Sequence, residues 1–133
     1  MSGRPAVDVV LPFRGSDEQL ELVAARLAAL RVEAGDSVTI ADNRRQARDA
    51  ERGHVEILAA GDLQTSYHAR NRGAERHAAP WIVFLDADVT PPPDLLDRYF
   101  EPVPADDVGV LAGAVVDEEA GADASAAARY AWL

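Results

Sequence analysis

The chain contains no cysteine, which excludes disulfide bonds and metal sites built on thiolates. This absence fits a reducing compartment, so we expect a cytoplasmic protein. Long hydrophobic runs are also missing, and no stretch approaches the roughly 18 apolar residues of a membrane-spanning helix. The N-terminal residues lack the apolar core and the cleavage site of a signal peptide. We therefore expect neither a membrane span nor secretion.

Positive charge is scarce. The 13 basic residues are outnumbered by 23 acidic residues, and the net charge is −10. Binding to nucleic-acid phosphates requires a basic face, so we expect no nucleic-acid partner. An anionic substrate would need a metal ion or a local group of arginines to neutralise it.

A glycine-rich phosphate loop is absent as well. The turn after the first predicted strand reads Pro12-Phe13-Arg14-Gly15. This turn matches neither the dinucleotide-binding fingerprint nor the P-loop. Phosphates are therefore not expected at a helix N-terminus, and a metal ion held by carboxylates is the natural substitute.

The remaining composition predicts one α/β domain over residues 1–133. A chain of 133 residues with 48% hydrophobic residues can bury a core. Strand-like and helix-like patterns alternate, which favours a mostly parallel sheet with right-handed crossovers. Residues 44–53 are charged and predict a short exposed helix or loop. The predicted strands are 7–12, 37–41, 54–58, 81–85 and 108–116, and the predicted helices are 16–34, 65–79, 94–100 and 123–133.

The most informative stretch is the apolar run 81–85, which ends in Asp86 and Asp88. A run that is apolar on both faces predicts a buried central strand. In open α/β sheets, ligands bind beyond the carboxyl ends of such strands. Two neighbouring carboxylates suit a hard divalent cation that also binds substrate phosphates. The alternative is that these aspartates only cap the following turn.

Other polar residues follow the first two predicted strands. Residues 12–14 come after the first strand, and Asp42 and Asn43 come after the second. The carboxyl ends of parallel strands share one edge of a sheet, so these groups should converge with residues 86–88. This convergence predicts one binding site at that edge.

Four motifs occur in register along the chain. They are Val-Asp-Val-Val-Leu-Pro (7–12), Ile-Ala-Asp-Asn (40–43), Ala-Arg-Asn-Arg-Gly (69–73) and Ile-Val-Phe-Leu-Asp-Ala-Asp (82–88). With these motifs the chain resembles the N-terminal, nucleotide-sugar-binding half of a family 2 glycosyltransferase. The resemblance implies the GT-A fold, a Rossmann-like layered sheet that is mostly parallel.

The resemblance also implies a function and roles for matching residues. The implied reaction is inverting transfer of a sugar from a UDP- or GDP-sugar to an acceptor hydroxyl. Asp88, together with Asp86, would hold Mg²⁺ or Mn²⁺ on the diphosphate, and Asp42 would accept a hydrogen bond from the base. The implied nucleotide and sugar contacts are Pro12, Phe13, Arg14, Asp42, Arg70, Asp86 and Ala87.

Simpler interpretations remain open for two of these residues. Asp42 could serve only as a turn residue. Arg70 could form a structural salt bridge rather than contact a ligand. Asn71, beside it, is better explained by packing of the helix than by ligand binding.

The chain departs from this family in two respects. A complete catalytic domain continues further and carries the acceptor site and the base carboxylate in its second half. We therefore expect a chain that is incomplete at its C-terminal side, with no catalytic base. Residues 43–45, Asn-Arg-Arg, also replace the small residues that usually follow the second strand.

Two alternatives to a glycosyltransferase donor domain stay open. One is a non-catalytic α/β binding or interaction module that associates with itself through an exposed apolar face, to which Trp132 and Leu133 could contribute. The other is a nucleotidyltransferase. It would require a glycine-rich basic loop after the first strand, and residues 12–15 contain only one glycine and one arginine.

Overall fold

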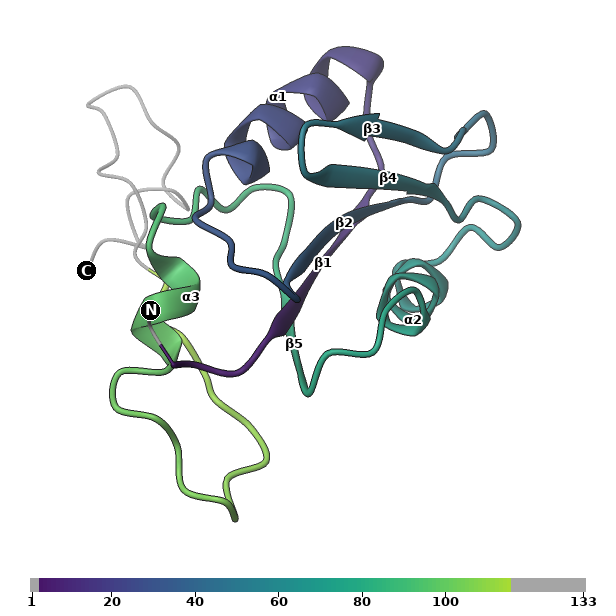
Figure 1. The fold of residues 1–133 in the computed structure, drawn as a ribbon. Helices are drawn as coiled ribbons and strands as arrows, with labels where there is room; N and C mark the ends of the chain where they lie inside the picture. Colours follow the sequence, from purple (N-terminus) through teal and green to yellow (C-terminus); the bar gives the residue numbers. More distant parts are fainter. Residues whose placement is uncertain (1–2, 116–133) are drawn as a thin grey trace, which may run out of the picture.

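The computed structural model describes residues 3–115, which fold around a mixed five-stranded sheet (Figure 1). The strand order is β3-β4-β2-β1-β5, and in this part of the chain only β3 runs antiparallel to its neighbour. This arrangement confirms the predicted α/β class with a mostly parallel sheet. The elements are β1 (Val7–Phe13), α1 (Asp17–Ala28), β2 (Ser37–Asp42), β3 (Ala50–Arg52), β4 (Val55–Ala59), α2 (Ser66–Glu75), β5 (Trp81–Phe84) and α3 (Leu95–Tyr99).

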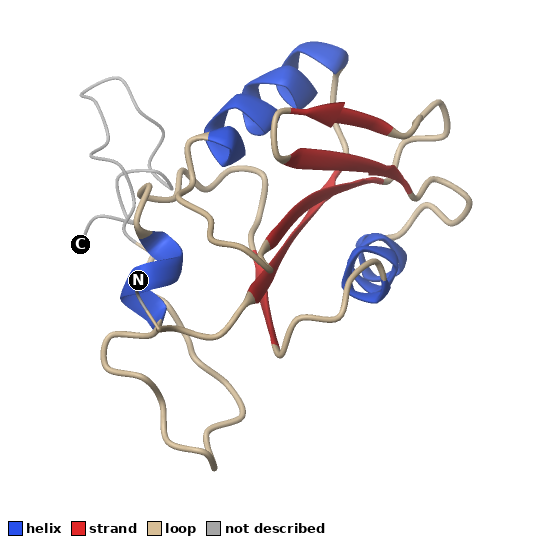
Figure 2. Ribbon diagram, viewed as in Figure 1, coloured by secondary structure: helices blue, strands red, loops and turns tan. Residues whose placement is uncertain are grey.

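The two longer helices lie on opposite faces of the sheet (Figure 2). Alternate residues of β1, β2 and β4 enter the larger core, which the apolar face of α1 completes. Successive side chains of a strand point to opposite faces, so every second residue of each strand reaches this core. Its fully buried strand and helix residues include Val7, Val9, Leu11, Val38, Ile40, Val55 and Leu27.

Helix α1 begins at the capping box that the sequence predicts. The Ser16 hydroxyl accepts a hydrogen bond from the Gln19 backbone N–H at 3.1 Å, and the Gln19 side chain accepts one from the Ser16 N–H at 2.8 Å. Two otherwise unpaired backbone donors are thereby satisfied. The helix ends at Ala28, several residues before the turn at Gly35, where we expected its end.

Helix α2 packs directly on the centre of the sheet, against β1 and β2. Gly73 makes this close approach possible, because a Cβ atom at that position would overlap the Val10 side chain. The glycine inside a predicted helix therefore has a packing reason. The helix ends at Glu75 rather than at residue 79, so the prediction was too long by about one turn.

The prediction that residues 81–85 form a buried central strand is wrong. Within residues 3–115, β5 is an edge strand that pairs only with β1. Trp81 and Val83 pack against the larger core, whereas Ile82 and Phe84 are 38% and 50% exposed. They lie on the face that α2 occupies, but α2 covers β1 and β2. An apolar run therefore does not by itself reveal a central position.

Two further predictions are also wrong. Part of the segment 44–53 forms β3, which pairs with β4 through a turn at Gly53. The stretch 108–115 forms no strand, and Val110 and Val115 are largely exposed. Gly113 lies so close to the Tyr99 ring that an added Cβ atom would overlap it. Val116 and the predicted helix 123–133 lie outside the described residues.

No helix within residues 3–115 is both long enough and apolar enough to cross a membrane.

Candidate functional site

The carboxyl ends of β1, β2 and β5 meet at one edge of the sheet. Phe13, the last residue of β1, pairs with Asp42, the last residue of β2. Beyond the end of β5, the Leu85 N–H donates a hydrogen bond to the Val10 carbonyl at 3.0 Å. The structure therefore brings residues 12–14, 42–43 and 86–88 to the same edge, as the sequence predicts.

Arg70 and Asp86 contact each other at this edge. The Nη2 atom of Arg70, in the second turn of α2, lies 3.3 Å from an Asp86 carboxylate oxygen. The Asp86 side chain is 68% exposed and the Arg70 side chain is 36% exposed. An ion pair so exposed adds little stability. Both groups therefore remain accessible to a ligand.

Asp86 and Asp88 flank Ala87 in the sequence, and both are exposed. Ala87 is half-buried against the core, and a turn follows in which the Val89 N–H donates to the Asp86 carbonyl. No group of three or more potential metal ligands occurs among the described residues. Two carboxylates can nevertheless hold Mg²⁺ when substrate phosphates and water complete its coordination. The donor set fits a hard cation that arrives with a diphosphate.

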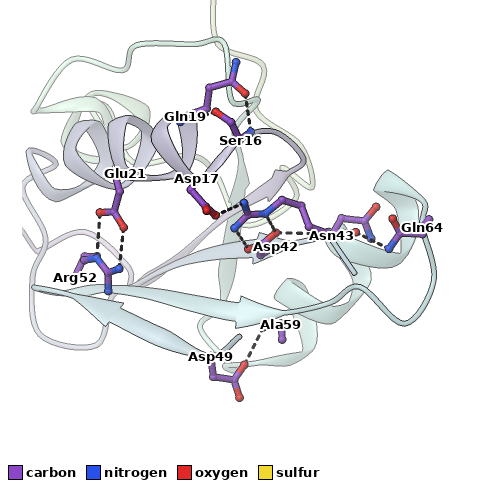
Figure 3. A network of polar contacts seen from close by, with 11 residues as sticks. Ser16, Asp17, Gln19, Glu21, Asp42, Asn43, Asp49, Arg52, Ala59 and Gln64 are labelled. Carbon is purple, nitrogen blue, oxygen red and sulfur yellow. Dashed lines mark hydrogen bonds and ion pairs between the residues drawn. The ribbon is translucent and has the colours of Figure 1, made fainter. Parts of the chain in front are cut away.

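Asp42 is buried within a network of polar contacts that also includes Asp17 and Asn43 (Figure 3). The Arg44 Nε–H donates to Oδ1 of Asp42 at 2.9 Å, and Nη2 donates to Oδ2 at 2.8 Å. The Arg44 backbone N–H also donates to Oδ1 at 3.1 Å, and Nη1 reaches the exposed Asp17 carboxylate at 2.7 Å. Both oxygens of Asp42 thus accept hydrogen bonds from Arg44.

The surroundings keep Arg44 charged and oriented. The hydrogen bond to Asp42 raises the pKa of the Arg44 guanidinium, although burial opposes this effect, and the bond to Asp17 raises it further. The guanidinium carbon also lies 5.5 Å from the centre of the Phe13 ring, which permits a cation–π interaction. Arg44 is therefore a fixed cation at the end of β2.

The loop that carries Arg44 is held by a dense set of hydrogen bonds. Asn43 donates from its backbone to the Phe13 carbonyl at 2.8 Å, and from its side chain to the carbonyls of Ala60 and Leu63. The Gln64 side chain donates to the Asn43 carbonyl at 2.7 Å. Asn43 stood out in the sequence only because it follows the second predicted strand. In the structure it stabilises this loop.

A pocket of about 570 Å³ opens beside this loop. This volume lies within the range of small-molecule sites, roughly 300–1,000 Å³. Arg14 and Arg45 are exposed there, and neither forms an ion pair with any residue between 3 and 115. The complete lining is Arg14, Gly15, Arg44, Arg45, Gln46 and Gln64.

Arg14 could be predicted at this site from the sequence, whereas the other lining side chains were not. The Arg44-Arg45 pair could have indicated a basic pocket. In the sequence it stood out only as a departure from the small residues that usually follow the second strand. In a chain with a net charge of −10, three arginines around one pocket are a local concentration of positive charge. Such a pocket attracts an anionic or acceptor-rich ligand.

Comparison with known protein families gives one match. The profile described as glycosyl transferase family 2 matches residues 35–129. The matched region includes the ends of β2 and β5 and the whole of α2. Searches of curated proteins and of solved structures gave no match.

Proposed function

Because the chain belongs to glycosyl transferase family 2, we propose that its carboxyl-edge site binds the nucleotide-diphosphate sugar donor of a glycosyl transfer. The donor is a UDP- or GDP-sugar, and the sugar passes to an acceptor hydroxyl with inversion. A family match over most of the chain supports the reaction class. The arrangement of charges at the sheet edge supports the kind of donor.

One observation carries the proposal: a cationic and two anionic side chains lie together at the open end of parallel strands. Arg70 contacts Asp86, and Asp88 lies two residues further along the same turn. Ligands of open α/β sheets bind at this edge. Carboxylates are suited to the metal ion of a diphosphate, and an arginine is suited to its phosphate oxygens.

In this assignment Asp88 and Asp86 hold Mg²⁺ or Mn²⁺ together with the diphosphate. When bound, the ion stabilises the negative charge that develops on the leaving diphosphate. When the donor binds, Arg70 leaves Asp86 and contacts the phosphate oxygens of the donor. Ala87 keeps the turn close to the core, so that its two neighbours stay directed toward the ligand.

Of residues 12–14 at the end of β1, only Arg14 lines the pocket that we assign to the nucleotide. Phe13 is buried beneath Arg44, while Arg14 is exposed in the pocket. Arg14 is free to contact the donor because no described residue pairs with it. We assign no described residue as the base that deprotonates the acceptor.

Isothermal titration calorimetry tests the proposal. We expect UDP or GDP to bind in the presence of Mn²⁺, and binding to be lost with a chelator or in Asp88→Asn. Asp106→Asn is the matched control, since Asp106 is an exposed aspartate outside the site. If neither nucleotide binds the folded protein with Mn²⁺, the donor-site proposal is wrong.

A second candidate is a non-catalytic module that associates with itself. The observation in its favour is the edge strand β5, where Ile82 and Phe84 expose apolar surface. Sedimentation equilibrium distinguishes this candidate. A concentration-dependent dimer that Phe84→Ser abolishes, in a protein that binds no nucleotide, would favour the module over the donor domain.

A further inference from the structure

The pocket beside β2 presents hydrogen-bond donors where a carboxylate was expected. Arg44 lines the pocket, whereas Asp42, the residue expected to accept a hydrogen bond from the base, does not. Asp42 is only 1% exposed, and Arg44 engages both of its oxygens. A base in this pocket therefore meets Arg44, whose side chain is 9% exposed, rather than a free carboxylate.

Arg44 keeps donors available after its internal contacts are made. A guanidinium group has five N–H donors. Asp42 takes the Nε–H and one N–H of Nη2, and Asp17 takes one N–H of Nη1. One N–H on Nη1 and one on Nη2 are left without a partner among the described residues.

The common bases differ in how they match two such donors. Uracil presents an N–H between its two carbonyl oxygens, and that N–H needs an acceptor from the protein. Guanine presents two neighbouring acceptors, O6 and N7, and a bidentate contact from arginine to these atoms is a frequent mode of guanine recognition. The paired state of Asp42 thus disfavours uracil, and the free donors of Arg44 favour guanine.

We propose that Arg44 determines the base specificity of the donor site and selects guanine over uracil, so that the substrate is a GDP-sugar. This inference rests on the proposed function, because it concerns the nucleotide of the same donor. Arg44 contacts the base directly, and Asp42 acts through Arg44 as a positioning residue.

The surrounding structure supports a contact of fixed geometry. The Asn43 and Gln64 hydrogen bonds hold the loop, and Gly61 lies so close to the Arg44 carbonyl that no side chain would fit there. The guanidinium is fixed on one side by Asp42 and lies over the Phe13 ring. A donor group held in this way loses little conformational entropy when it binds a ligand.

Calorimetric titration of GDP, UDP, CDP and ADP with Mn²⁺ tests the inference. We expect GDP to bind at least about tenfold more tightly than UDP, the discrimination that a good bidentate contact provides. In Arg44→Lys, which keeps the positive charge but lacks the planar fork, the ratio of the two affinities should fall toward one. Arg52→Lys is the matched control, because Arg52 holds Glu21 in a similar two-point contact away from the pocket.

The outcomes separate this inference from the proposed function. Metal-dependent binding in which UDP, CDP or ADP equals or exceeds GDP overturns the guanine assignment and leaves the donor site standing. An unchanged ratio in a folded Arg44→Lys variant overturns the role of Arg44. Arg44→Ala provides a second variant, and circular dichroism establishes that each variant is folded before its ratio is compared.

Discussion

Arg4 and Asp36 form a two-point ion pair that is almost completely buried. The distances from Nη1 to Oδ1 and from Nη2 to Oδ2 are 3.1 and 2.7 Å, and the side chains are 2% and 0% exposed. Asp36 also accepts hydrogen bonds from the backbone N–H groups of Val7 and Glu33. The pair therefore joins the start of β1 to the turn that precedes β2.

Removing one partner of this pair should destabilise the fold strongly. We expect Asp36→Ala to lower the free energy of unfolding by about 3–5 kcal/mol, because it removes four hydrogen bonds to Asp36 and leaves buried Arg4 with Asp97 as its nearest carboxylate. Urea unfolding followed by circular dichroism measures the effect. Arg52→Ala, which breaks the exposed pair with Glu21, should cost less than about 1 kcal/mol. Equal losses in the two variants would contradict the buried role of Asp36.

The same pair predicts how stability depends on pH. Burial alone would raise the pKa of Asp36, but hydrogen bonds from Arg4 and from the Glu33 and Val7 backbone hold the pKa below its usual value of 3.8. A carboxyl group with a depressed pKa stabilises the folded state above the pKa of the unfolded chain. This stabilisation should therefore be lost as the pH falls below about 4. Thermal unfolding at several pH values tests the prediction, and Asp36→Asn should show a shallower loss.

Gly73 should not tolerate alanine, although alanine is usually the better helix former. Gly→Ala inside a helix normally stabilises by about 1 kcal/mol. At position 73 the added Cβ atom would overlap Val10, so we expect Gly73→Ala to lower the free energy of unfolding by about 1–3 kcal/mol. Gly109→Ala is the control, because no atom lies within 4 Å of its added Cβ. A stabilised Gly73→Ala variant would mean that α2 does not pack closely on β1.

Arg14 should contribute to binding but not to stability. It is exposed in the pocket and pairs with no other residue in the described part of the chain. We expect Arg14→Ala to weaken nucleotide binding about tenfold or more, the value of one lost charged hydrogen bond. The thermal midpoint should stay unchanged. Arg48→Ala, at another exposed arginine, should alter neither quantity.

Features with a local cause could be predicted from the sequence. The capping box at Ser16 and the alternating pattern of β4 each depend on residues a few positions apart. The positions of Asp42, Asp86 and Asp88 at one edge follow from strands that run parallel. These predictions required no knowledge of which segments lie side by side.

Features that depend on distant partners could not be predicted. Within residues 3–115, the place of β5 at the edge is set by which strands pair, and its own four apolar residues do not encode that choice. Residues 108–115 have strand-like composition but find no partner within the described chain.

The engagement of Asp42 by Arg44 was missed for another reason. A short-range pair of opposite charges in a loop can fold together or point apart, and only the packing around Phe13 and Asn43 decides between these outcomes.

Within residues 3–115, the two edges of the sheet differ in the side chains that they present. At one edge β3 is short and carries the charged side chains of Glu51 and Arg52, which discourage pairing with another chain. At the other, β5 presents an uncharged apolar strand, the kind of segment from which aggregation begins. Asp86 and Asp88 then act as gatekeeping charges at its end. Substitutions that neutralise them to test metal binding therefore also remove a safeguard of solubility, and such variants are best measured at low protein concentration.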